Sequence, residues 1–221
     1  MSELERPVYD PRRTVALVVG ILAAIAFVIL SWVIYVDGRQ PLAPDLWWHG
    51  LMIANLTKPG VVIAWVPSIV GGTIGMIVIA IVLVVVFIWR KRRWDAANIA
   101  IAIALVVAIG APMSYIVARA RPSDSLAEST ATSFPSGHTA VATTVVVTLA
   151  LLLRKWYVWV GGVLWVLWMM WARTYLHAHW LSDVIAGLLE GIAVATLVWC
   201  AMEAIRDRRA MRSRDPAPTK A

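Results

Sequence analysis

The sequence predicts an all-α polytopic membrane protein with six transmembrane helices and an interfacial helix between the first and the second. Hydrophobic residues make up 61% of the 221 residues and charged residues only 15%, a balance that no ordinary soluble domain of this size shows. The basic residues cluster at the ends of long apolar runs. The net charge of +7 therefore reflects membrane topology, and we expect no nucleic-acid partner.

Six apolar runs, some with the help of their polar flanks, provide the roughly 20 residues that cross a bilayer. Pro67 and the pair Gly71–Gly72 predict a kink or a break in the second span. The first run is too long for the core of a signal peptide, so we expect it to be retained. The expected spans are Thr14–Val36, Val61–Trp89, Ala96–Ala118, Thr139–Leu153, Trp156–Trp171 and Val184–Ile205.

The segment PDLWWHGLMIANL, which follows the first span, mixes Trp47 and Trp48 with polar groups. This pattern is typical of a helix that lies in the membrane interface. A plain aromatic belt is an equally good interpretation of the same residues.

The distribution of basic residues predicts the orientation. Of the 20 Lys and Arg residues, 15 lie in the two terminal segments and in the loops after the second and fourth spans. The positive-inside rule then places both termini in the cytoplasm of a cell-membrane protein. The expected organisation is a cytoplasmic tail over residues 1–13, a membrane domain over 14–205 and a disordered basic tail over 206–221. The single cysteine, Cys200, excludes an intramolecular disulfide.

Three chemically rich stretches fall on the outer face of this topology. ARARPSD ends the third span, FPSGHT begins the fourth, and ARTYLHAHWLSD joins the fifth to the sixth. Ionisable residues are costly near a bilayer and normally have partners or a function. Their convergence at one end of the helices predicts a polar site there.

The residue types in these stretches suit a phosphate group. At the start of a helix, the N–H groups of Ser136, Gly137 and His138 would face an anion, and glycine lets it come close to the backbone. Arg121 and Arg173 can each direct two hydrogen bonds at phosphate oxygens. A simple helix cap is the alternative role for Ser136.

Two histidines have spacings that suit catalysis. Asp183 follows His179 by four residues, so on a helical turn its carboxylate can hold one imidazole nitrogen and leave the other as a nucleophile. His138 can donate a proton to a leaving oxygen. Arg119 is a further phosphate-binding candidate, although a side chain that extends from the end of its span toward water is the better interpretation.

Together, Arg121–Pro122, Pro135–His138 and Arg173–Asp183 resemble the three signature motifs of the type 2 phosphatidic acid phosphatase superfamily. The resemblance covers the whole chain, because membrane members have six spans and an outward-facing site. The chain departs from the pattern at Ser114, where the first motif has a lysine, and at Ala172, where the third often has a serine.

The resemblance implies hydrolysis of a phosphate ester through a phosphohistidine, without metal or other cofactor. His179 would be the nucleophile, Asp183 would orient it, and His138 would be the general acid. The implied phosphate-binding residues are Arg121, Ser136, Gly137 and Arg173.

A phosphate site at the outer ends of spans suits a lipid substrate, and a polyprenyl diphosphate carrier is the first choice by analogy with the family. The alternatives are phosphatidylglycerol phosphate, phosphatidic acid, and a carrier or flippase that binds lipid phosphate without cleaving it. A metal-dependent hydrolase built on His177 and His179 is a third interpretation. Asp124 and Glu128 are expected to be solvated loop charges, with electrostatic gating of the site as the alternative. Glu190 is expected to be buried and hydrogen-bonded.

Overall fold

The computed structural model describes residues 10–128 and 130–212. In these ranges the chain forms eight helices and one isolated bridge, between Ala120 and Thr132, and it contains no longer strand. The helices are α1 (Pro11–Val36), α2 (Ala43–Ala54), α3 (Lys58–Val70), α4 (Thr73–Trp89), α5 (Arg93–Val117), α6 (Gly137–Leu153), α7 (Trp156–Tyr175) and α8 (Leu181–Arg212). The predicted all-α class is confirmed.

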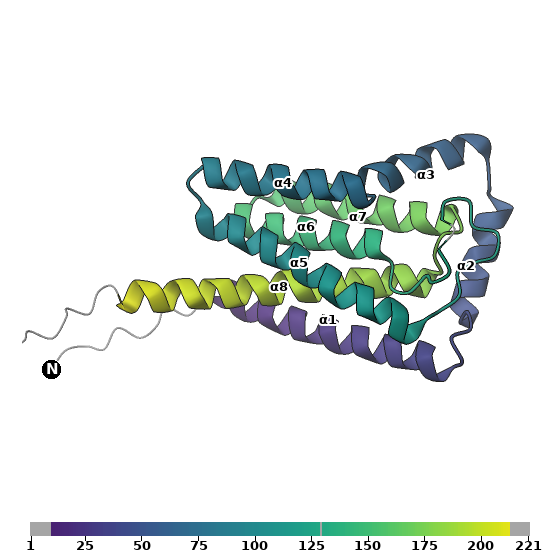
Figure 1. The fold of residues 1–221 in the computed structure, drawn as a ribbon, viewed down its shortest axis with the longest axis horizontal. Coiled ribbons are helices and arrows are strands. Elements are labelled where there is room, and N and C mark those ends of the chain that lie inside the picture. Colours follow the sequence, from purple (N-terminus) through teal and green to yellow (C-terminus); the bar gives the residue numbers. More distant parts are fainter. Residues whose placement is uncertain (1–9, 129, 213–221) are drawn as a thin grey trace, which may run out of the picture.

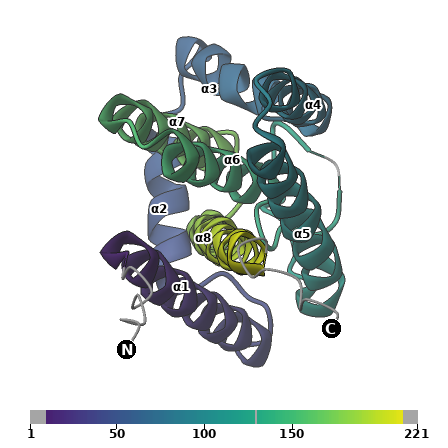
Figure 2. The ribbon, with the colours of Figure 1, turned by 90° about the vertical axis from the view of Figure 1, so that its left-hand side faces the viewer.

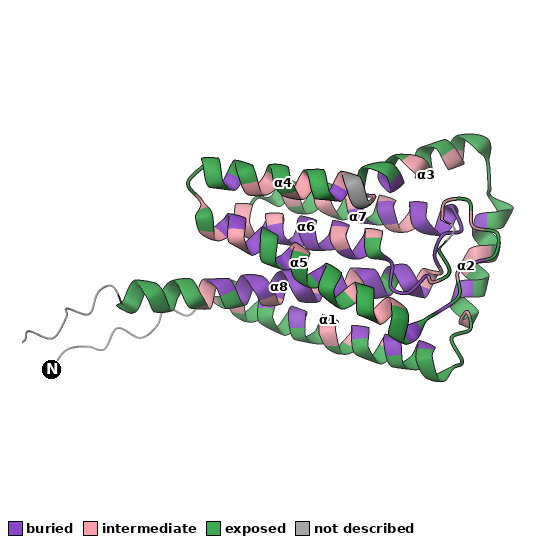
Figure 3. Cartoon of the chain, viewed as in Figure 1, coloured by how far each residue is buried: buried purple, intermediate pink, exposed green. Residues whose placement is uncertain are grey.

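The long helices run side by side, and α2 crosses one end of the bundle (Figure 1). Seen along its length, the bundle has α8 in its middle, with α1, α5, α6 and α7 around it (Figure 2). Buried residues accordingly gather along α8, whereas α1 and α4 are largely exposed (Figure 3). The exposed side chains of α1 and α4 are mostly apolar, as expected for surfaces that face lipid.

Small residues let α8 pack against α6. A Cβ on Gly187 would lie 2.5 Å from the carbonyl oxygen of Ser136, and one on Gly191 would lie 2.6 Å from that of Ala140. Small residues four apart permit this close backbone approach between membrane helices. The approach also lets the N–H of Ser136 donate to the carbonyl oxygen of Asp183 over 3.1 Å. It therefore joins two of the predicted motifs directly.

Within residues 10–128 and 130–212, three helices, α1, α5 and α8, are long and apolar enough to cross a membrane, and a fourth span results if α3 and α4 count as one. The pair α3 and α4 is bent by 47°, which agrees with the break predicted at Pro67 and Gly71–Gly72. The apolar helix α6 is shorter, with 17 residues. Six spans and an interfacial position for α2 remain predictions.

The segments outside the bundle differ in part from the expected organisation. Helix α8 continues through Arg212, so residues 206–212 extend the last helix instead of beginning a disordered tail. The predicted tails over 1–9 and 213–221 lie outside the described residues.

Candidate active site

The three predicted motifs meet at the end of the bundle that α2 crosses (Figure 1). Residues 118–136 form the connection from α5 to α6, and residues 176–180 join α7 to α8. One backbone hydrogen bond, from Leu126 N–H to the carbonyl of Leu176 at 2.9 Å, ties the two connections together. A second, from Ser133 N–H to the carbonyl of Arg119 at 2.9 Å, closes the first connection on itself. The site is thus assembled from segments that are distant in sequence.

Two arginines hold one carboxylate at the centre of the site. Glu128 Oε2 lies 2.9 Å from Arg121 Nη2, and Glu128 Oε1 accepts a hydrogen bond from Arg173 Nη2. His138 Nδ1 lies 3.7 Å from the same Oε1. The expectation that Glu128 is solvated was wrong, because its carboxylate lies among the cationic groups predicted to bind phosphate.

The charge environment of Glu128 agrees with this geometry. Burial raises the pKa of its carboxyl, but Arg173, His179 and Arg121 more than reverse this effect and leave the pKa below its ordinary value. These groups therefore converge on one position that favours an anion.

Neighbouring groups fix both arginines in place. Arg121 donates to the carbonyl oxygens of Thr130, at 3.1 Å, and of Thr132, at 2.6 Å. Arg173, which is 1% exposed, donates to Ser68 Oγ on α3 at 3.2 Å. Arg121 also donates to the carbonyl oxygen of Ala178 and, at 3.0 Å, to Thr130 Oγ1, so only one N–H of its Nη1 is left for a ligand. Arg173 keeps more of its donors, since its Nε has no hydrogen-bond partner among the described residues.

The start of α6 has the geometry of an anion site. Gly137 and His138 lie in the first turn, where an α-helix leaves its first N–H groups without intrahelical partners. A Cβ on Gly137 would meet no heavy atom within 4 Å, so the space on this side of the residue is open. Ser136 is the N-cap, but its hydroxyl pairs with Thr139 Oγ1 at 3.1 Å and caps no N–H. Since its own N–H is bonded to Asp183, Ser136 can offer only its hydroxyl.

The imidazole of His179 is buried and oriented. Nδ1 lies 2.7 Å from the carbonyl oxygen of Ser133 and 3.8 Å from Asp183 Oδ2. The first distance is that of a hydrogen bond and the second is too long for one. A carbonyl only accepts, so Nδ1 carries the proton and the lone pair is on Nε2. Ser133, rather than Asp183, is therefore the direct partner of this ring.

Burial, together with the nearby Arg173, lowers the pKa of His179, although Asp183 opposes the shift. At neutral pH the ring is accordingly neutral. A neutral imidazole with a free nitrogen is the form that can act as a nucleophile.

The sequence predicted that the side chain of Arg119 extends toward water. This prediction was wrong, because Arg119 is completely buried. Its guanidinium donates to Asp183 Oδ1 at 2.7 Å, to Asp45 Oδ2 at 2.6 Å and to Ser182 Oγ at 2.7 Å. A desolvated arginine needs such acidic partners, and α2 supplies one of them, Asp45. The hydrogen bonds of Arg119 thus join α2 to the start of α8.

Two further predicted positions have structural partners. Ser114, which replaces the family lysine, bonds through Oγ to Thr132 Oγ1 over 2.8 Å. His177 lies with His49 and Asp124, the one group of three possible metal ligands among the residues that the structure describes. His179, its partner in the alternative metal-site interpretation, is not in this group. Burial lowers the pKa of His177, although Asp124 opposes this.

An apolar cavity of about 580 Å³ extends from His138 between α4, α5, α6 and α8. Glu190 lines it, and neither of its carboxyl oxygens has a hydrogen-bond partner among the described residues. Glu190 is therefore buried as expected, but it is not hydrogen-bonded. The cavity gives the polar site an apolar neighbour large enough for part of a lipid chain.

Known proteins share both the sequence pattern and the fold. A model of the PAP2 superfamily matches residues 95–207, just over half of the chain. An undecaprenyl-diphosphatase of Sulfolobus acidocaldarius is 28% identical over 156 residues, which cover 67% of this chain and 68% of the relative. A second relative, from Escherichia coli strain K12, is 32% identical over 139 residues.

The fold also matches a solved structure, that of the transmembrane PAP2 type phosphatidylglycerolphosphate phosphatase from Bacillus subtilis. The TM-score is 0.75 at 20% identity, over 84% of this chain and 96% of that chain. These matches confirm the resemblance found in the sequence. With the apolar helices, they identify a multi-pass membrane protein.

Proposed function

Because this chain belongs to the PAP2 superfamily of membrane phosphatases, we propose that it removes a phosphate from a lipid phosphate or diphosphate at the membrane surface. The observation that carries the proposal is the position of Glu128. Its carboxylate lies between Arg121 and Arg173, with His138 beside it. A phosphoryl group that displaced this carboxylate would meet the same donors.

The phosphate would be bound by Arg121, Arg173 and the first turn of α6. Forked guanidinium donors match phosphate oxygens, and the N–H groups of Gly137 and His138 add charge stabilisation from the helix terminus. Ser136 supports this turn through its hydroxyl and its backbone bond to α8. Arg119 is not included, because its side chain is fully buried and both of its Nη groups already serve Asp45, Asp183 and Ser182.

His179 is the proposed nucleophile. Its Nε2 attacks phosphorus, the bond between phosphorus and the leaving oxygen breaks, and protonated His138 gives that oxygen its proton. Nδ1–H keeps its bond to the carbonyl of Ser133, while the nearby carboxylate of Asp183 stabilises the charge that the ring acquires. The product is a phosphohistidine with no metal in the step.

Water then completes the cycle. It attacks the phosphohistidine, His138 takes up its proton, and the bond between nitrogen and phosphorus breaks. Inorganic phosphate leaves, and His179 returns as a neutral imidazole. The two steps use His138 first as an acid and then as a base.

The proposed first-choice substrate is a polyprenyl diphosphate. The apolar cavity beside His138 would take the first part of its tail, and the name of the archaeal relative points to the same class. Phosphatidylglycerol phosphate is the second candidate, favoured by the name of the structural neighbour, and phosphatidic acid is a third. The positive-inside rule favours cytoplasmic termini and a site on the outer face of the cell membrane.

Trapping the intermediate tests the mechanism. The protein is mixed with a polyprenyl diphosphate labelled in its terminal phosphate and quenched in alkali, which preserves phosphohistidine. We expect label on the wild type and none on His179→Ala. Retention of intact labelled lipid without phosphate release would instead indicate a carrier. Initial rates with the three candidate lipids then rank them as substrates.

A further inference from the structure

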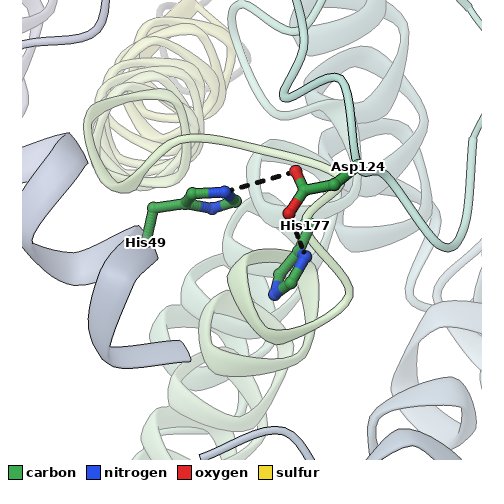
Figure 4. A group of neighbouring side chains, drawn as sticks. All are labelled: His49, Asp124 and His177. Carbon is green, nitrogen blue, oxygen red and sulfur yellow. Dashed lines mark ion pairs between the residues drawn. The ribbon is translucent and has the colours of Figure 1, made fainter. Parts of the chain in front are cut away.

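A second cluster of ligand-type side chains lies beside the candidate active site. His49 comes from α2, Asp124 from the connection between α5 and α6, and His177 from the turn after α7 (Figure 4). One potential ligand atom from each residue, a ring nitrogen or a carboxylate oxygen, lies within 4.8 Å of the other two. No step proposed for phosphate transfer uses these three residues.

The distances suit a bound cation. His49 Nε2 lies 3.2 Å from Asp124 Oδ1, and His177 Nδ1 lies 2.8 Å from Asp124 Oδ2. Tetrahedral ligands at about 2.1 Å from an ion lie about 3.4 Å from one another. Small side-chain movements would therefore bring all three atoms within bonding distance of one ion.

His177 gives an independent indication. Its side chain is 3% exposed, yet among the described residues neither ring nitrogen has a well-aligned hydrogen bond. Buried polar atoms are rarely left in this state, because the loss of hydration is then uncompensated. Nδ1 faces the Asp124 carboxylate at short range without the alignment of a hydrogen bond. A ligand bond would satisfy this nitrogen.

From these observations we propose that His49, Asp124 and His177 bind one divalent transition-metal ion. Zinc is the ion that these three ligands suit best. Two imidazoles and one carboxylate suit zinc better than magnesium or calcium, which prefer oxygen ligands. Asp124 is 43% exposed, so water has access to the remaining position. The ion would join α2 to the two connections that carry the active site.

Zinc binding is measured on purified protein without a polyhistidine tag, after treatment with a chelator and its removal. Equilibrium dialysis should show about one zinc per wild-type chain. His49→Ala and Asp124→Asn should each weaken binding more than about 100-fold, since even residues that only support ligands contribute about 10- to 100-fold. His138→Ala, in the neighbouring site, is the matched control and should bind zinc as the wild type does.

Two readouts other than activity complete the test. Cobalt in place of zinc should give the visible absorption of a low-symmetry site in the wild type and in His138→Ala, but not in His49→Ala. Zinc should raise the melting temperature of the wild type and not that of His49→Ala, while the two proteins melt alike without metal. Absence of stoichiometric zinc, or full binding by His49→Ala and Asp124→Asn, would overturn the proposal. Neither result bears on phosphate transfer.

Discussion

Arg119 Nη1 donates to Asp183 Oδ1 over 2.7 Å, and both side chains are fully buried. The same guanidinium also holds Asp45, 74 positions earlier in the chain. Asp183 lies 3.8 Å from the imidazole of the proposed nucleophile, His179. The ion pair thus connects the start of α8, beside the candidate active site, with the helix that crosses the bundle end, an arrangement that suits a positioning role.

Replacing Arg119 should therefore affect folding more than phosphate binding. Arg119→Met leaves two buried carboxylates without their cation, and breaking such a pair typically costs about 3–5 kcal/mol. We expect a marked fall in the melting temperature in detergent. Adding Asp45→Asn should recover part of the loss, because one of the unpaired charges is then removed.

The matched control is Arg39→Ala, which removes an exposed arginine at the same end of the bundle. This substitution should change the free energy of unfolding by no more than about 0.5 kcal/mol. A raised KM with an unchanged melting temperature in Arg119→Met would contradict the positioning role and return Arg119 to the phosphate-binding residues.

Much of the helical architecture was predictable, because apolar runs and positions of Pro and Gly are local features of the sequence. Helices α1, α5 and α8 overlap their predicted spans almost completely. The meeting of the three motifs at one end was also predictable, since alternating spans bring alternate loops to the same side.

The errors concern charges whose partners are distant in sequence. Arg119 was expected to reach water because its neighbours could not reveal Asp45 on another helix. Glu128 was expected to be solvated because it lies in a polar connection, and only the fold places it between Arg121 and Arg173. An acidic residue between two arginine-containing motifs is the signal in the sequence that could have indicated the position of Glu128.

If phosphate binds as proposed, Glu128 must compete with it for Arg121 and Arg173, because its carboxylate contacts both arginines. Glu128→Gln keeps the shape of the side chain and removes its charge, so inorganic phosphate and vanadate should inhibit more tightly, by about tenfold. Because the pKa of Glu128 is lowered, the wild-type carboxylate stays ionised and continues to compete between about pH 6 and 8. Inhibition constants at several pH values measure the effect.

Glu203→Gln is the control for this experiment, since it removes a charge near the far end of α8. Its inhibition constants should match those of the wild type. Unchanged or weaker inhibition of Glu128→Gln by both anions would mean that Glu128 supports the site rather than occupying the phosphate position.

The proposed orientation can be tested with single cysteines in a Cys200→Ser background. Ser123 and Lys155 are both exposed and lie at opposite ends of the bundle. An impermeant thiol reagent added to intact cells should label Ser123→Cys and leave Lys155→Cys unmodified until the membrane is opened. The reverse pattern would place the active site on the cytoplasmic side.

The cavity beside His138 should determine how long a lipid tail the enzyme accepts. Ala80 lines this cavity on α4, so Ala80→Trp would fill part of it with a large side chain. The measured quantity is kcat/KM for a long polyprenyl diphosphate divided by kcat/KM for a short-chain analogue. We expect this ratio to fall at least about tenfold, the equivalent of about 1.4 kcal/mol. The short analogue should still be cleaved, because the phosphate-binding residues are unchanged.

Ala104→Trp is the matched control: it adds the same side chain to an exposed position on α5 outside the cavity lining and should leave the ratio as in the wild type. Equal losses with both substrates in Ala80→Trp would show that the cavity serves the fold and does not bind the tail.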